Sequence, residues 1–341
     1  MSTSNKPLAL IIGASGLTGE TITGAMLKAG DFRLAALIRP ASMAKSSTEA
    51  LRAQGIEIRA GDVTCDAKEL KDALHGVHTV VSAVAFWHLL DQKNVIRAAK
   101  EAGVQRIVPC DFGTPGARGI RELLDIKYEI HDFIEELGVP HTYIEVGWWA
   151  EFFIPVPSRS GIPEALKANS NVMYGDGSRK NLVTNPAHIG LWVARIVADP
   201  RTINQKVVVW DDEVTQTEAF AIAGRISGDA EALEASRTKV TLEELRKAQT
   251  DADAALKEDP TATAHKVTYS LMDYNYSIHF AQESTLQNAK KLGHLDAHEL
   301  YPDLVQRKFE EFATEFYAQK EPGDFLIDML EGYGWKIRNT Q

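Results

Sequence analysis

The sequence LALIIGASGLTG, residues 8–19, decides the fold of this chain. A short apolar run ends in glycines spaced G-x-x-G-x-x-G at Gly13, Gly16 and Gly19, and a helical pattern follows over 20–29. Glycine permits a tight turn and a close approach to a pyrophosphate, and a helix N-terminus presents unpaired N–H groups. The stretch therefore predicts the first strand, turn and helix of a dinucleotide-binding fold, with a ligand-free glycine turn as the alternative.

Composition sets the class of protein. The 341 residues suffice for one large or two smaller domains, and the 44% hydrophobic and 25% charged fractions are ordinary for a soluble globular protein. The net charge of −10, without a long basic run, argues against nucleic acid as a partner. No apolar stretch reaches membrane-spanning length, and the start of the chain leads directly into the first strand without a signal peptide.

Cysteines and histidines indicate neither a disulfide framework nor a metal site. The two cysteines, Cys65 and Cys110, lack metal-ligand spacing, and the ten histidines form no H-E-x-x-H pair. A cytoplasmic protein without a metal is the simplest expectation. The sequence leaves the oligomeric state open, a homodimer included.

Strands and helices alternate regularly in the first half of the chain. After the first helix, the pattern predicts strands over 32–38, 56–60, 79–84, 106–109 and 141–146, with helices over 67–74, 89–102 and 120–137. This alternation predicts right-handed crossovers and a doubly wound parallel sheet covered on both faces.

The end of the second strand indicates which dinucleotide binds. An acidic residue there accepts hydrogen bonds from the ribose of NAD, whereas an arginine pairs with the 2′-phosphate of NADP. This chain has Arg39, followed by Lys45 without a carboxylate between them, which favours NADP(H). An exposed arginine that merely ends a strand is the alternative.

Further cofactor contacts follow from the rule that ligands lie outside the carboxyl ends of parallel strands. Asp62 falls where the loop after the third strand approaches the adenine, although it is also a common turn residue. The residues that we expect to bind the cofactor are Gly13, Ser15, Gly16, Leu17, Thr18, Gly19, Arg39, Lys45, Asp62, Ser82, Ala83, Val84, Lys127, Val146 and Gly147.

Lys127 is the candidate catalytic residue. It lies on the apolar face of the helix over 120–137, four residues after Leu123 and three before Ile130. A buried lysine needs a partner, which predicts a bond to the nicotinamide ribose or a role in proton transfer. The alternative is a packed stem whose ammonium reaches water. His131, one turn on, is expected to be a packed core histidine.

The second half combines aromatic clusters with charged helices. Trp148, Trp149, Phe152 and Phe153 follow the sixth strand and are expected either to line a pocket for a flat, ring-bearing substrate or to form the core between two domains. A strand over 206–210 returns to the sheet. The aromatic stretch over 269–280 is expected to be a helical lid, with Tyr269, Tyr274 and Tyr276 as candidate proton donors.

The chain resembles the NmrA-like branch of the atypical short-chain dehydrogenases, near the isoflavone reductase and phenylcoumaran benzylic ether reductase group. The matching pieces span nearly the whole chain and are GASGLTG at 13–19, Arg39 with Lys45, GD at 61–62, VVSAV at 80–84, VQRIVPCDFG at 104–113, Lys127, GVPHTYIEVGWW at 138–149 and ELYPDL at 299–304. The resemblance implies an NADP(H)-binding Rossmann domain, with Lys127 as the catalytic lysine and Arg39 and Lys45 as 2′-phosphate binders.

Two departures from that pattern bear on the substrate. Leu123 stands where ordinary short-chain dehydrogenases carry the tyrosine of Tyr-x-x-x-Lys, and Cys110-Asp111-Phe112-Gly113 replaces the group's usual Ser-Glu-Phe-Gly. Asp111 and Phe112 are expected to contact the substrate, so the changed segment alters a pocket wall. Lys127 is left without a neighbouring phenol.

These observations predict an NADPH-dependent reductase of aromatic or polycyclic small molecules in secondary metabolism. Residues 1–147 form the cofactor domain, to which 186–211 return, and residues 148–185 and 212–341 form a smaller, mostly helical substrate domain. The rivals are an NADP(H)-sensing regulator without turnover and an enzyme that couples reduction to a cyclisation or isomerisation.

Overall fold

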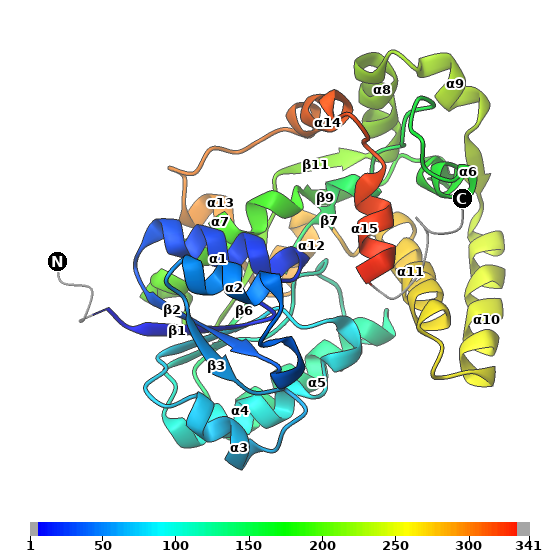
Figure 1. The fold of residues 1–341 in the computed structure, drawn as a ribbon. Helices are drawn as coiled ribbons and strands as arrows, with labels where there is room; N and C mark the ends of the chain where they lie inside the picture. Colours follow the sequence, from blue (N-terminus) through cyan, green and yellow to red (C-terminus); the bar gives the residue numbers. More distant parts are fainter. Residues whose placement is uncertain (1–5, 333–341) are drawn as a thin grey trace.

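The computed structural model describes residues 6–332 (Figure 1). The first predicted domain thus begins, and the second ends, with residues outside the described part, 1–5 and 333–341. The strands are β1 (Leu8–Ile12), β2 (Arg33–Ile38), β3 (Glu57–Ala60), β4 (Thr79–Ser82), β5 (Arg106–Val108), β6 (Thr142–Val146), β7 (Trp148–Trp149), β8 (Val172–Tyr174), β9 (Lys180–Thr184), β10 (Gln205–Val209), β11 (Asp212–Thr215), β12 (Thr238–Val240) and β13 (His294–Asp296). The helices are α1 (Leu17–Ala29), α2 (Ser46–Ala53), α3 (Ala67–Ala73), α4 (Gln92–Ala102), α5 (Glu122–Leu137), α6 (Glu164–Ser170), α7 (Pro186–Ala198), α8 (Gln216–Ser227), α9 (Ala230–Ala235), α10 (Leu242–Glu258), α11 (Thr263–His279), α12 (Leu286–Lys291), α13 (Ala297–Leu300), α14 (Phe309–Ala318) and α15 (Asp324–Gly332).

The central sheet is parallel and doubly wound, which confirms the predicted fold class. Its first strands pair in the order β3-β2-β1-β4-β5, and β6, β10 and β13 pair in parallel as a second group. A parallel bridge between Ile107 and His141 joins β5 to the start of β6. The strand predicted over 206–210 is β10, which pairs with β6 and returns the chain to the sheet.

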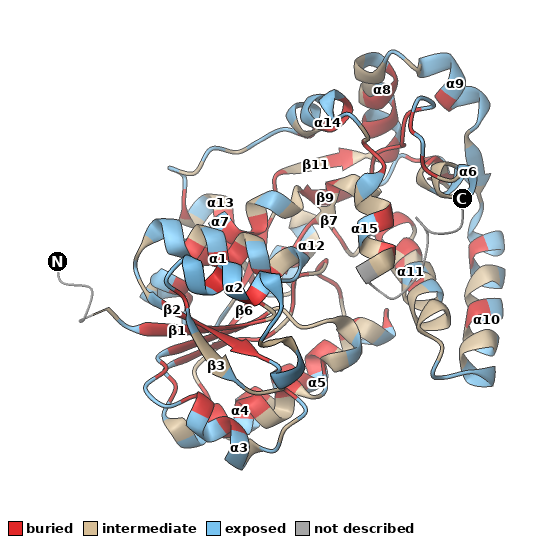
Figure 2. Ribbon diagram, in the orientation of Figure 1, coloured by how far each residue is buried: buried red, intermediate tan, exposed pale blue. Residues whose placement is uncertain are grey.

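Helices cover both faces of the sheet, as the continuous apolar strands require. In Figure 1, α1, α2, α7 and α13 cover one face and α3, α4 and α5 the other. Alternate residues of β1 enter the two layers, since Ala9 and Ile11 pack toward α1 and α7, whereas Leu10 packs toward α3, α4 and α5. Buried residues accordingly run through the strands and the inner helix faces in Figure 2.

The predicted glycine turn is present, but α1 begins earlier than expected. The helix starts at Leu17, directly after Gly16, so Gly19 lies in its first turn. A Cβ on Gly19 would come within 1.9 Å of the Gly13 carbonyl oxygen, so glycine lets the helix pack against the turn. Gly13 itself has a φ of 78°, which an L side chain rarely adopts.

The second part of the molecule lies beyond the carboxyl ends of the sheet strands (Figure 1). It contains the small β7-β9-β11 sheet and a separate apolar core that includes Ile154, Phe220 and Phe316. One stretch assigned to this domain from sequence belongs elsewhere, because β13 pairs with β10 and Tyr301 packs into the core of the first domain. The sequence did not indicate this return to the sheet, because a three-residue strand carries too little periodic signal to be recognised.

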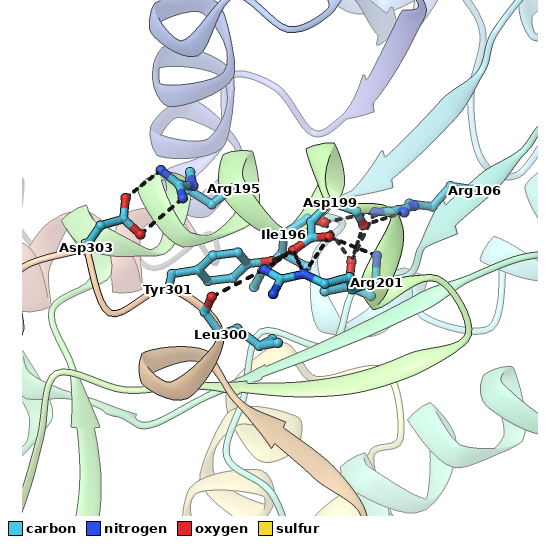
Figure 3. Close-up of polar contacts among 9 residues, drawn as sticks. Arg106, Arg195, Ile196, Asp199, Arg201, Leu300, Tyr301 and Asp303 are labelled. Carbon is cyan, nitrogen blue, oxygen red and sulfur yellow. Dashed lines mark hydrogen bonds and ion pairs between the residues drawn. The ribbon is translucent and has the colours of Figure 1, made fainter.

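A polar network fixes this returning segment at the amino end of the sheet (Figure 3). Arg106, the first residue of β5, is buried and donates to the carbonyl oxygens of Ile196 and Asp199, each at 2.9 Å. The Tyr301 hydroxyl donates to the Asp199 carboxylate at 3.0 Å. The ELYPDL motif at 299–304 therefore holds the returning segment against the first half of the chain. This contact lies at the amino end of β5, the end remote from Lys127.

Candidate functional site

Four loops meet along the carboxyl ends of β1, β4, β5 and β6. A Cβ on Gly13 would lie 2.3 Å from the Ala83 carbonyl oxygen, which shows how closely the first and fourth strands' loops approach. The Cys110 thiol donates to the Val84 carbonyl oxygen at 3.2 Å, joining the loops after β4 and β5. The Val146 N–H donates to the Gly113 carbonyl oxygen at 2.9 Å, which joins the end of β6 to the loop after β5. These contacts form one continuous edge, which we call the strand-end edge.

The start of α1 on this edge fits the pyrophosphate of a dinucleotide. Gly16 is the N-cap and supplies no capping side chain, so the first N–H groups of the helix remain for an anionic ligand. Ser15 and Leu17 are exposed and Thr18 is half-buried beside them. On β4, the Ser82 hydroxyl is buried and has no hydrogen-bond partner among residues 6–332.

The predicted 2′-phosphate binders lie together beyond β2. Arg39 directly follows the strand, and Lys45 is the N-cap residue of α2. Both side chains are exposed, and neither forms an ion pair within the described residues. Asp62, by contrast, is engaged locally, because its carboxylate accepts from the Thr64 N–H and hydroxyl at 3.0 Å each. In this structure the Asp62 side chain therefore stabilises the turn after β3, as the alternative interpretation of Asp62 expected.

The end of β6 is more enclosed than the other predicted cofactor positions. Val146 is fully buried, and the Gly147 N–H donates to the Val209 carbonyl oxygen at 2.8 Å. A Cβ on Gly147 would meet the backbone of Leu182 and Val183 at 2.8 Å. Close packing against β9 therefore explains this glycine without a cofactor contact.

Lys127 projects from α5 toward the loop after β5. The residue is 8% exposed, and its ammonium makes no hydrogen bond or ion pair within residues 6–332. A Cβ on Gly113 would lie 3.0 Å from Lys127 Nζ, which places the ammonium directly at the strand-end edge. The predicted burial of Lys127 is present, and its charge is free to bind a ligand.

Asp111 and Phe112 do not face a substrate in this structure. The Asp111 carboxylate is 1% exposed and lies 2.7 Å from Nε2 of the buried His131. The His131 ring stacks on Tyr143 with centroids 3.6 Å apart, so this histidine is packed as expected. Phe112 is buried in the core beneath α1 and α7. Sequence position alone could not separate these core side chains from the pocket wall, because both classes follow the same strand.

The aromatic residues after β6 divide between the two expected roles. Trp148, Trp149 and Phe152 are half-buried and packed on one another, with ring centroids 5.5 Å apart for Trp148–Phe152. Phe153 instead is 2% exposed and packs against Phe309 in the core of the second part. The substrate role predicted for Phe153 is therefore not supported, because Phe153 lies in that core. Phe325 of α15 extends the half-buried cluster at 5.7 Å from Phe152 and had no sequence signal.

The predicted helical lid is α11, and it is anchored on α5. The Asp273 carboxylate accepts from the N–H of Glu122 at 3.3 Å and caps α5, whose own N-cap Arg121 supplies no capping bond. The Tyr274 ring lies 4.9 Å from the Trp148 ring and 4.3 Å from the Arg121 guanidinium. Tyr276 instead contacts Arg246 of α10 at 3.6 Å.

Of the three candidate tyrosines, Tyr274 reaches Lys127. A Cβ on Gly113 would meet the Tyr274 hydroxyl oxygen at 2.6 Å. Arg121, which sequence reasoning missed, is 2% exposed and donates to Thr114 through both terminal nitrogens. A lone arginine before a helix carries no pattern that marks it as part of a site.

Two groups next to Lys127, Cys110 and Glu145, shape the electrostatics there. Burial raises the pKa of the Cys110 thiol to about 11, although the nearby Lys127 ammonium opposes this rise. The thiol is therefore protonated at neutral pH. Burial also opposes ionisation of Glu145, but His294 at 2.6 Å holds the pKa of this carboxyl below its usual range.

A small pocket of about 10 Å³ lies elsewhere, between β9, α7 and the segment over 307–315. The Asp211 carboxylate in this pocket already accepts from the Asn185 N–H and contacts His188, so, unlike the Lys127 ammonium, it is hydrogen-bonded within the protein.

Among residues 6–332, no group of three or more acidic, histidine or cysteine side chains gathers in a way that suits a metal ion. No helix in the same range has the length and apolarity to cross a membrane.

Comparison with known proteins gives a consistent picture. The model of the NmrA-like family matches residues 5–313. Asnovolin J 5′,6′-dehydrogenase of Aspergillus novofumigatus is 31% identical over 310 residues, which cover 89% of this chain and 94% of that protein. A phenylcoumaran benzylic ether reductase of Pyrus communis is 33% identical over 216 residues, covering 60% of this chain and 69% of that protein.

Solved structures share the fold. Leucoanthocyanidin reductase of Vitis vinifera, in a binary complex with NADPH, superposes with a TM-score of 0.72 at 22% identity over 92% of this chain and 100% of that one. An isoflavone reductase superposes with a TM-score of 0.70 at 23% identity, again over 92% and 100% of the two chains.

Proposed function

Because the chain belongs to the NmrA-like family, as its motifs indicate, we propose that it is an NADP(H)-dependent reductase of aromatic or polycyclic small molecules. The acceptor is a conjugated carbonyl, an imine or a benzylic carbon, and secondary metabolism is the proposed setting. The similarity to a fungal dehydrogenase and to plant reductases over most of the chain supports the oxidoreductase class.

Lys127 is the observation on which this proposal depends. Its ammonium is largely buried, unpaired within the described residues, and placed at the strand-end edge beside the aromatic cluster. Burial of a charge without an ion-pair partner is costly, and the interaction with Glu145 behind Lys127 is a longer-range one. A ligand with oxygen acceptors is the partner that offsets this cost.

The strand-end edge and the residues beyond β2 each have a role toward NADPH, whose nicotinamide would supply a hydride. Gly13, Gly16 and the start of α1 receive the pyrophosphate, and Arg39 and Lys45 hold the 2′-phosphate. Lys127 bonds the ribose or transfers a proton to the substrate. The protein thus contributes orientation and electrostatics.

The test follows NADPH oxidation by absorbance against aromatic enones, imines and benzylic ethers. Wild type and Lys127→Ala are compared after both are shown to bind NADPH by fluorescence. Turnover that collapses in the variant supports the reductase and the role of Lys127, whereas turnover that survives removes Lys127 from the chemistry.

Product analysis separates the rival functions. A product without net redox change points to a cyclisation or isomerisation, and tight NADPH binding without turnover on any acceptor favours a sensor. Either result overturns the proposed simple reductase.

A further inference from the structure

Two hydrogen-bond donors from different domains converge above Gly113. A Cβ on this glycine would lie 2.6 Å from the Tyr274 hydroxyl oxygen and 3.0 Å from Lys127 Nζ. Lys127 comes from α5 beneath the sheet and Tyr274 from α11 in the second part. The absence of a side chain at Gly113 is what allows both polar atoms to occupy this point.

Neither donor is satisfied by the protein. The Tyr274 hydroxyl and the Lys127 ammonium make no hydrogen bond to any residue in the range 6–332, although Tyr274 is half-buried and Lys127 buried. Neither atom is fully cut off from solvent, so a ligand can reach both, and the protein leaves their hydrogen-bonding capacity open. Two such groups at one point indicate a position for an acceptor atom of a ligand.

Two cationic side chains border this point, and the carboxylates of Glu145 and Asp273 lie behind them, within electrostatic range of Lys127 and Arg121. The Arg121 guanidinium lies over the Tyr274 ring at 4.3 Å and forms no ion pair within the described part of the chain. Lys127 adds a second cation on the other side of the hydroxyl. A protonated imine would place a third positive charge here and is disfavoured by repulsion, whereas an oxygen that gains negative charge is stabilised.

The neighbouring surface suits a conjugated ring system. Trp148 lies 4.9 Å from Tyr274 and continues into the half-buried cluster with Phe152. Among the acceptors of the proposed function, the α,β-unsaturated carbonyl alone combines a flat conjugated system with an oxygen that becomes negative as hydride adds to its β-carbon.

We propose that Lys127 Nζ and Tyr274 Oη together bind the carbonyl oxygen of an α,β-unsaturated ketone or aldehyde, and that Tyr274 donates the proton. This inference rests on the proposed reductase function and specifies its substrate class. Hydride addition at the β-carbon moves the C=C electron pair toward the carbonyl oxygen, and the Tyr274 O–H bond breaks as the enol O–H bond forms. Water returns a proton to the phenolate, and the enol tautomerises to the saturated carbonyl compound, so one proton is consumed for each hydride.

The binding test uses 4-(dimethylamino)cinnamaldehyde, whose absorption moves to longer wavelength when its carbonyl oxygen is bonded by a donor or a cation. It is added to protein loaded with NADP⁺, so that no turnover occurs. Wild type is expected to shift the band, Tyr274→Phe to shift it less, and the double variant with Lys127→Met not to shift it. Tyr276→Phe is the matched control on the same helix, because Tyr276 contacts Arg246 instead.

The kinetic test uses the same variants with NADPH and an aromatic enone. Tyr274→Phe is expected to lower kcat about 100-fold, the scale of a lost general acid, while KM changes little and Tyr276→Phe matches wild type. Thermal melting and NADPH fluorescence verify that each variant is folded and loaded.

The outcomes separate this inference from the proposed function. An unshifted band with wild type, or an equal shift with Tyr274→Phe, overturns the two-donor site even if the enzyme reduces imines or benzylic ethers. A shift that depends on both residues supports the site even if no enone is turned over, in which case only the reductase function fails.

Discussion

The phenol oxygen of Tyr274 and the ammonium of Lys127 both lie within 3.0 Å of the position that a Cβ on Gly113 would take. The two residues are 147 positions apart in the chain and belong to different helices, α11 and α5. Their meeting point at the strand-end edge gives the candidate site its chemistry and makes Gly113 a sensitive position.

Gly113→Ala is expected to fold and to lose activity. The new methyl group must displace Tyr274 and Lys127, and misplacement of reacting groups by about 1 Å costs roughly 100-fold in rate. Turnover of NADPH with an enone measures the loss. Gly24→Ala is the control, because no atom lies within 4 Å of its Cβ. Full activity of Gly113→Ala would show that the two groups need not stand where the structure has them.

Replacing Arg39 and Lys45 by serine is expected to weaken NADPH binding selectively. Each charge-assisted bond to a phosphate contributes about 1.5–3 kcal/mol, so the loss of both residues raises the dissociation constant by roughly 100-fold or more. The constant for NADH, which lacks the 2′-phosphate, stays unchanged. Arg33→Ser, at the opposite end of β2, is the matched charge control. Equal weakening of NADPH and NADH would contradict the assignment.

Arg106→Leu is expected to lower the free energy of unfolding by about 2 kcal/mol, because it removes the two hydrogen bonds from Arg106 to the carbonyl oxygens of Ile196 and Asp199, which then keep only their bonds from Thr202 and the backbone. Chemical denaturation measures the change. Arg201→Leu, in the same network but exposed, is expected to have a much smaller effect. NADPH affinity of the folded Arg106 variant stays at the wild-type value, since the network lies at the amino end of the sheet; a parallel loss of affinity would refute this separation.

The buried His294–Glu145 pair predicts a fall of stability at alkaline pH. Burial disfavours the charged imidazole, but the Glu145 carboxylate raises the pKa of His294 above its ordinary value of 6.5. The stabilisation from His294 is therefore fully present below pH 6.5 and is lost as the pH rises through the folded pKa. For Glu145, whose pKa is lowered from 4.5, stabilisation is present above pH 4.5 and is lost on acidification.

Denaturation of wild type and His294→Gln across pH 5 to 9 measures this contribution. We expect the difference in unfolding free energy between the two proteins to shrink as the pH rises, because the wild-type ion pair disappears. His75→Gln, which changes an exposed histidine, is expected to follow wild type throughout. A difference that stays constant with pH would mean that His294 is not charged in the folded protein.

Much of the fold and part of the site were predictable from local patterns. The glycine turn, the alternating strands and helices, Arg39 with Lys45, and a lysine on the apolar face of α5 each follow from residues close in sequence. Three features were not predicted from the sequence. The strand β13 has only three residues, and neither Arg121 nor Phe325 belongs to a periodic pattern that marks it as part of a site. Asp111 and Phe153 have the residue types of a site but belong to buried packing.

The sequence by itself determined the class of fold, the expected cofactor and the residue most suited to bind it, because strand, turn and helix preferences and the spacing of glycines act over a few residues. Only the tertiary structure decided that Tyr274 rather than Tyr269 or Tyr276 stands beside Lys127, and that Phe153 and Asp111 are core. These distinctions depend on which face of one element packs against another, and such contacts link residues whose separation along the chain leaves no local pattern.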